Sequence, residues 1–139
     1  MPVRTETLVD GSTARIYELG FKHYKLEIVY RGYVVATIEA NQHDAGVDAN
    51  DMFVVLTFDG TVTSWIGGSV LGPGSFPLPD GSTAVITRAT QDHATLNIVH
   101  RGSVTATLDA NQHDDAVNAN GMYVVLTFDG QFSAWISTP

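Results

Sequence analysis

Residues 23–44 read HYKLEIVYRGYVVATIEANQHD, and residues 93–114 read HATLNIVHRGSVTATLDANQHD. In both stretches, two runs rich in β-branched and aromatic side chains flank an Arg-Gly pair. Such runs on either side of a glycine-containing turn are typical of an antiparallel β-hairpin. The two stretches therefore predict an all-β chain of antiparallel strands in which the same hairpin occurs twice.

The likeness extends well beyond the hairpins, at a constant offset of 70 residues. Of the 59 aligned pairs between residues 8–66 and residues 78–136, 34 are identical. Self-similarity at a fixed offset is the sequence signature of a repeated structural unit. We therefore predict a tandem duplication, with a first β repeat at residues 1–66, a Gly-rich linker at 67–74 and a second β repeat at 75–139.

Each repeat is too short to bury much apolar surface by itself. We therefore expect the strands of both repeats to share one core about a pseudo-twofold axis. A closed barrel and a two-sheet sandwich both satisfy this pattern. One helical turn is expected at residues 44–50, where Asp44 is placed to act as an N-cap.

The chain is acidic. Its 139 residues include 7 Lys and Arg against 15 Asp and Glu, which gives a net charge of −8. Because phosphate binding needs a cationic surface, we expect no nucleic acid as a partner. An anionic membrane surface is disfavoured for the same reason, and no apolar run approaches the roughly 20 residues of a membrane span. We therefore expect no membrane partner.

The chain contains no cysteine, which excludes disulfides, thiolate nucleophiles and Cys-zinc sites. No signal peptide is visible at the start of the sequence. The localisation therefore stays open between a cytoplasmic protein and a secreted one whose leader has been trimmed.

The turn of the first hairpin decides which side chains share a face. A two-residue loop at Arg31-Gly32 would mix apolar and polar side chains on each face. A three-residue loop at residues 30–32, with Gly32 in the left-handed conformation, pairs Leu26 with Ala36 and separates the faces. The predicted apolar face holds Leu26, Ile28, Val34, Ala36 and Ile38, and in the second repeat Leu96, Ile98, Val104, Ala106 and Leu108.

On the opposite face, the same register places a histidine beside a carboxylate in each repeat. It pairs His23 with Glu39 and His93 with Asp109. Because side chains alternate along a strand, the Asn and the His that follow the carboxylate lie on its face. The predicted ligand-binding residues are His23, Glu39, Asn41, His43 and Asp44, and in the second repeat His93, Asp109, Asn111, His113 and Asp114.

Three interpretations of these residues stay open. They form a solvated His–carboxylate pair and a capped turn, or a site for a polar ligand, or a centre for metal or acid–base chemistry. Two imidazoles and one carboxylate are a common ligand set for divalent metals. The metal ligands would be His23, Glu39 and His43, and in the second repeat His93, Asp109 and His113. Apart from a divalent metal, no cofactor is predicted.

The final hairpin of the first repeat is predicted to turn at Asp59-Gly60 with a two-residue loop. This register places Trp65 on the face of Val54 and Leu56. Both faces are apolar, so one packs in the core and the other meets the second repeat, another subunit or a ligand. For Trp65 and Trp135 we favour structural packing over stacking on a sugar.

These features favour a non-enzymatic, lectin-like binding protein with two quasi-equivalent sites for a small polar ligand. A saccharide is the first choice, because Asn, Asp and His supply directional hydrogen bonds. One alternative is a small β-barrel enzyme that uses His–carboxylate acid–base or metal-assisted chemistry. Another is a protein–protein interaction or inhibitor module, for which a homo-oligomer is allowed. No catalytic sequence motif separates these classes.

Overall fold

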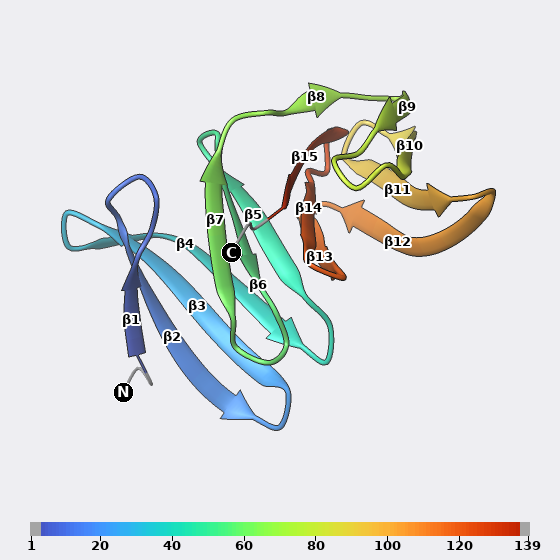
Figure 1. Ribbon diagram of the computed structural model, residues 1–139. Coiled ribbons are helices and arrows are strands. Elements are labelled where there is room, and N and C mark those ends of the chain that lie inside the picture. Colours follow the sequence, from blue (N-terminus) through green and yellow to red (C-terminus); the bar gives the residue numbers. More distant parts are fainter. Residues whose placement is uncertain (1–3, 137–139) are drawn as a thin grey trace.

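The computed structural model describes residues 4–136, and over that range it consists of strands and their connections (Figure 1). All strand pairs are antiparallel. The all-β prediction is therefore confirmed. Within the same range, no helix is long and apolar enough to cross a membrane.

The strands of the first half, β1 to β7, form two sheets. The four-stranded sheet follows chain order, with β1 (Arg4–Thr7), β2 (Thr13–Gly20), β3 (His23–Tyr30) and β4 (Tyr33–Asn41). The three-stranded sheet contains β5 (Ala45–Ala49), β6 (Met52–Leu56) and β7 (Val62–Ile66). Strand β5 occupies the segment where we expected a helical turn, because residues 45–49 pair with β6 instead.

The second half, β8 to β15, also forms two sheets. One contains β9 (Gly74–Pro77), β10 (Thr83–Thr90), β11 (His93–His100) and β12 (Ser103–Asn111). The other has the order β13-β14-β15-β8, with β8 (Val70–Leu71), β13 (Asp115–Ala119), β14 (Met122–Leu126) and β15 (Gln131–Ile136). Figure 1 shows β8 running from the end of β7 across to the second half.

The four sheets do not close into a barrel over residues 4–136, so the barrel alternative is wrong. The buried apolar side chains form three clusters rather than the single shared core that we expected. One cluster lies between the two sheets of the first half and a second between the two sheets of the second half. The third combines residues of both halves: Phe53, Val55, Trp65, Ala116, Tyr123 and Val125.

This third cluster, which we call the seam cluster, joins the halves through β6, β7, β13 and β14. Phe53 stacks on Trp65 with ring centroids 5.8 Å apart. The indole Nε1 of Trp65 donates a 2.7 Å hydrogen bond to Oγ of Ser133 in β15. The second apolar face of the final hairpin thus meets the other half of the chain, one of the three partners that the sequence allowed.

The turn of that hairpin is one residue longer than predicted. Leu56 pairs with Val62, and the Thr57 amide donates to the Thr61 carbonyl across a three-residue loop. The Thr57 hydroxyl stabilises this wider loop, because it donates to Asp59 and accepts from the Thr61 amide at 3.0 Å. The one-residue shift moves Trp65 to the opposite face of the hairpin, so the predicted placement of Trp65 was wrong.

The turn of the β3–β4 hairpin also differs from the prediction. Arg31 and Gly32 form a two-residue loop with φ angles of 52° and 83°, as a type I′ turn requires. The extra residue lies inside the strand instead, where a β-bulge sets both Val34 and Val35 against the single residue Val29 before Ala36 pairs with Ile28.

The shorter loop and the bulge each shift the β3–β4 register by one residue from the predicted one, so that Leu26 pairs with Ile38 and not with Ala36. A shift of two residues keeps every side chain on its face. Leu26 and Ile38 are therefore buried as predicted. Val34 and Val104 lie before the bulge and are 49% and 58% exposed, so their assignment to the apolar face was wrong.

Candidate functional site

Both predicted His–carboxylate contacts are present, although the register that predicted them was wrong. His23 lies directly opposite Asn41 in the ladder, and its Nε2 reaches diagonally to the Glu39 carboxylate. His93 lies opposite Asn111, and its Nε2 lies 2.5 Å from Oδ1 of Asp109. Diagonal neighbours on one face of a ladder are within reach of long side chains.

His43 and His113 follow the ends of β4 and β12. They do not continue the strand face as predicted, because Gln42 and Gln112 turn the chain with φ angles of 63° and 64°. In each histidine, Nδ1 lies 2.9 Å from the carbonyl oxygen of the next residue. Because a carbonyl only accepts, Nδ1 is the donor and Nε2 is the acceptor nitrogen of the neutral ring.

Two adjoining hollows of about 280 Å³ and about 500 Å³ lie where the halves meet, and together we call them the seam groove. His43, His113 and Asp115 line both hollows. Asp109 lines the smaller hollow and Glu39 the larger one. The structure therefore brings six of the ten predicted residues, three from each half, into one groove, whereas the sequence suggested two separate sites. The four that do not line it are His23, Asn41, His93 and Asn111.

The groove presents hydrogen-bond acceptors and negative charge. Its carboxylates are those of Glu39 and Asp109, which are exposed, and of Asp115, which is half-buried. Among the residues described as lining it there is no Lys or Arg. Asp115 lies close to Asp109, because its Oδ2 accepts from the Asp109 amide at 3.0 Å. Asp115 was not among the predicted residues, because the position 70 residues earlier is Ala45 and the carboxylate therefore has no counterpart in the first half.

Asp44 connects the two halves and does not cap a helix. Its Oδ2 accepts a 2.8 Å hydrogen bond from the backbone amide of Asn118, which lies in β13 of the other half. Its Oδ1 accepts from the Phe58 amide of its own half at 3.2 Å. With both oxygens bound to the backbone and 9% of the residue exposed, Asp44 stabilises the seam rather than facing a ligand.

Asp114 makes the corresponding contacts, with the roles of the two halves exchanged. Its Oδ2 accepts from the Asp48 amide at 2.9 Å, and its Oδ1 accepts from the Phe128 amide at 3.3 Å. Burial raises the pKa of the Asp114 carboxyl, and the two amides partly offset that rise. The pair Asp44 and Asp114 therefore forms a reciprocal clamp across the groove floor. Both residues were predicted as ligand-binding residues, and the structure assigns their carboxylates to the backbone.

Asn41 and Asn111 are exposed at the ends of β4 and β12, opposite His23 and His93. Over residues 4–136, no group of three or more His, Cys, Asp or Glu side chains is arranged to hold a metal ion. The turn at Gln42 explains why His23, Glu39 and His43 do not form the predicted ligand set. Only the His23–Glu39 contact of that set is present.

The aromatic residue of the groove is not one of the two tryptophans. Trp65 is 4% exposed in the seam cluster, and Trp135 stacks on it with ring centroids 6.4 Å apart. Structural packing is therefore confirmed for Trp65. Phe128 lines the larger hollow and is 41% exposed, so its ring offers a flat apolar surface to a ligand.

Neither a protein-family model nor a curated protein matches this sequence. The chemistry of the groove is therefore the basis for assigning a function.

Proposed function

We propose that this chain is a non-enzymatic binding protein whose seam groove binds a small polar ligand, with a saccharide as the first choice. One observation carries the proposal. The two histidines at the centre of the groove come from different halves, line both hollows and each have Nδ1 bound to a carbonyl. That bond fixes each imidazole and leaves Nε2 of His43 and His113 as an acceptor for a ligand.

The chemistry of the lining favours a ligand that donates hydrogen bonds. The imidazole Nε2 atoms and the carboxylates of Glu39, Asp109 and Asp115 all accept, and saccharide hydroxyls all donate. The half-exposed ring of Phe128 supplies a flat surface for the apolar face of a sugar. The net charge of −8 and the acidic lining favour neutral or cationic ligands over anionic ones.

We also propose that the groove arose with a tandem duplication and has pseudo-twofold symmetry. Residues that line the smaller hollow correspond, at an offset of 70, to residues that line the larger one. Asp109 corresponds to Glu39, and Val117 corresponds to Val47. The hollows are then two quasi-equivalent subsites, and a ligand that spans both gains affinity from each.

A glycan array followed by calorimetric titration tests the proposal. We expect the wild type to bind at least one neutral or cationic saccharide. The double variant His43→Ala/His113→Ala should bind it at least about ten-fold more weakly, because each lost hydrogen bond contributes about 1 kcal/mol. His100→Ala is the matched control, since His100 is an exposed histidine at the β11–β12 turn. Equal binding of the wild type and the double variant to every ligand would overturn the proposal.

A further inference from the structure

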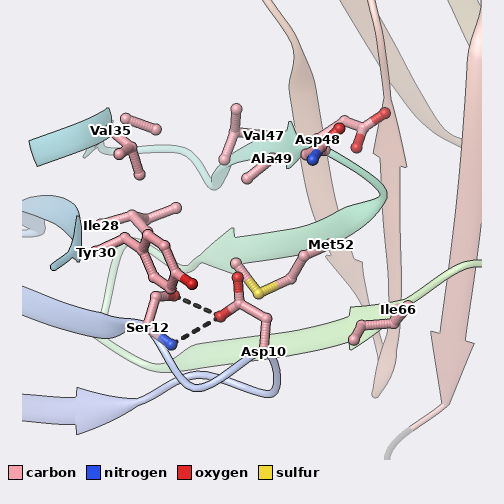
Figure 2. A pocket seen from close by; sticks show the side chains of 12 residues that line it. Asp10, Ser12, Ile28, Tyr30, Val35, Val47, Asp48, Ala49, Met52 and Ile66 are labelled. Carbon is pink, nitrogen blue, oxygen red and sulfur yellow. Dashed lines mark hydrogen bonds between the residues drawn. The ribbon is translucent and has the colours of Figure 1, made fainter.

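The largest cleft described in the molecule lies in the first half, and neither groove histidine lines it. Its volume is about 770 Å³, which is within the range of small-molecule sites. The cleft opens between the two sheets, with Ile28 of β3 on one side and Ala49 and Met52 of the facing sheet on the other (Figure 2). The side chains of Ile28 and Met52 are buried, so the walls of the cleft belong to the apolar core. We call this the first-half cleft.

Two side chains that point between the sheets are exposed at the open end of the cleft. Tyr30 lies on the face of Ile28, because side chains alternate along β3. Ile66 pairs with Met52 in the β6–β7 ladder and lies on its face. Tyr30 and Ile66 both line the cleft, yet they are 45% and 58% exposed. The space between the sheets is therefore incompletely filled at this end, and a ligand there would remove apolar surface from water.

The charged groups at the first-half cleft are already bound or point elsewhere. Asp10 lies at the rim, where its Oδ1 accepts from the amide and the hydroxyl of Ser12 at 2.9 Å and 2.5 Å. Asp48 pairs with Phe53 and shares its face, which is that of the seam cluster, so its carboxylate points away from Met52 (Figure 2). No Lys or Arg is among the described residues that line the cleft. Because a charged ligand would lose hydration against these apolar walls, the cleft favours a neutral one.

The corresponding positions of the second half show which lining residues are particular to this cleft. Nine of the twelve lining residues recur unchanged 70 positions later. The three that differ are Tyr30, Val35 and Asp48, which correspond to His100, Thr105 and Asn118. Since the Asp48 side chain points away, a ligand meets two of these differences, and in both of them the first half has the more apolar residue.

We propose that the first-half cleft binds a neutral, mainly apolar small molecule that carries an aromatic ring. The side chains of Ile28 and Met52 supply apolar contact, and a thioether packs favourably against an aromatic ring. The Tyr30 ring at the open end adds an aromatic contact, and its hydroxyl can bond one neutral polar group of the ligand. A hollow of this volume between two sheets suits a small molecule rather than a protein segment. Of the cleft residues, only Val47 also lines the seam groove.

The first test is a titration with 2-naphthalenemethanol, followed by NMR of the methionine methyl groups. The chain has 3 methionines, and Met122 occupies the position that corresponds to Met52. We expect the Met52 signal to shift and the Met122 signal to move less, so that the second half serves as an internal control. Two charged probes with the same rings complete the series. 2-Naphthoate should bind more weakly than the alcohol, and 2-naphthylmethylamine should bind no more tightly, because the cleft walls solvate neither charge.

The second test fills the cleft. Ala49 pairs with Met52 and lines the cleft, so the larger side chain of Ala49→Leu occupies the space that the ligand needs. This variant should show no shift of the Met52 signal at probe concentrations that saturate the wild type. Ala119→Leu, which makes the same change at the corresponding position of the second half, is the matched control and should bind like the wild type.

A third test changes the aromatic rim and keeps the proposal falsifiable if Ala49→Leu does not fold. Tyr30→His installs the residue that the second half has at this position, namely His100. It should bind 2-naphthalenemethanol about three-fold more weakly, the effect of losing one aromatic contact. Tyr33→Ser removes an exposed tyrosine of the same hairpin that does not line the cleft, and should bind like the wild type.

Three results would overturn the proposal. The first is a titration in which 2-naphthalenemethanol does not move the Met52 methyl signal. The second is equal affinity of this probe for the wild type and for a folded Ala49→Leu, or for the wild type and Tyr30→His. The third is tighter binding of 2-naphthylmethylamine than of the alcohol, because a carboxylate and not the apolar lining would then carry the affinity. None of these results bears on the seam groove, since the cleft is tested with its own probes and its own variants.

Discussion

At the scale of single residues, the two clamp carboxylates connect the halves through hydrogen bonds to the backbone. Asp44 and Asp114 each accept one backbone amide from their own half and one from the other. A carboxylate oxygen that accepts an amide gives a charge-assisted hydrogen bond, stronger than one between neutral groups. Removing a clamp carboxylate would also leave the Asn118 or the Asp48 amide without its partner.

We therefore predict that Asp44→Ala lowers the free energy of unfolding by about 1.5–3 kcal/mol, the usual range for hydrogen bonds to a charged group. Asp114→Ala should have an effect of the same size. Urea unfolding followed by circular dichroism measures both. Glu18→Ala, which removes an exposed carboxylate from β2, is the control and should change stability little. If Asp44→Ala and Asp114→Ala were as stable as the control Glu18→Ala, the clamp would contribute nothing to stability.

The sequence predicted some of the site residues for sound reasons and missed others. The contact of His23 with Glu39 followed from placing both on one face of a hairpin, and the two-residue error in register left the faces unchanged. The turn at Gln42 was not predictable from the alternation of side chains, because a positive φ at a non-glycine residue leaves no mark in that pattern. His43 was therefore placed on the wrong surface.

At the scale of elements, the length of each turn decides which side chains lie on which face of a hairpin. The three-residue loop of the β6–β7 hairpin places Trp65 in the seam cluster, and a two-residue loop would have turned it away. The sequence contains the cause, because Thr57 and Asp59 hold the wider loop through the threonine hydroxyl. The Asp-Gly signal alone does not distinguish a two-residue from a three-residue loop.

The Thr57–Asp59 contact predicts a pH dependence of stability. The side-chain hydrogen bond from Thr57 holds the pKa of Asp59 below its ordinary value. A lowered carboxyl pKa stabilises the folded chain above the unfolded value of about 3.9, and this contribution is lost as the pH falls through the folded pKa. The stability difference between the wild type and Asp59→Asn should therefore be largest near neutral pH and shrink below about pH 4. Urea unfolding at several pH values measures this difference in the free energy of unfolding. A difference that does not change with pH would contradict a stabilising Thr57–Asp59 contact.

A second element-scale prediction concerns the close approach of β5 to β13. A Cβ atom added at Gly46 would lie 2.5 Å from the Ala116 Cβ and 2.9 Å from the Val54 carbonyl oxygen. Gly46→Ala should therefore destabilise the chain by about 1–3 kcal/mol, the usual cost of overpacking a core. Gly20→Ala is the control, because its nearest neighbour would be 4.0 Å away. Thermal unfolding compares the two, and equal midpoints would contradict the close approach.

At the scale of the whole molecule, the halves have separate cores and a joint seam. Each core lies between two sheets of one half, and the seam cluster and the clamp connect the halves. The sequence predicted the strands and the antiparallel pairing. It did not predict that groove residues of the two halves meet, because the packing of one half on the other depends on long-range contacts that no local pattern contains.

The seam cluster predicts that the two halves unfold together. Trp65→Ala removes the stacking on Phe53 and the hydrogen bond to Ser133, and should cost about 3–5 kcal/mol. Trp135→Ala, which truncates a 43% exposed side chain, should cost less. Methionine methyl signals measured in urea check this prediction. Met52 and Met122 should lose their native signals at the same urea concentration in the wild type and at different concentrations in Trp65→Ala.

The central claim is that the two halves build one binding groove, with a histidine from each at its centre. The most direct test is an NMR titration of the imidazole signals with the saccharide that the glycan array selects. The claim predicts that the signals of His43 and His113 shift together with one binding constant, while the signal of His100 stays in place. Shifts confined to one of the two groove histidines, or the absence of any shift in both, would contradict it.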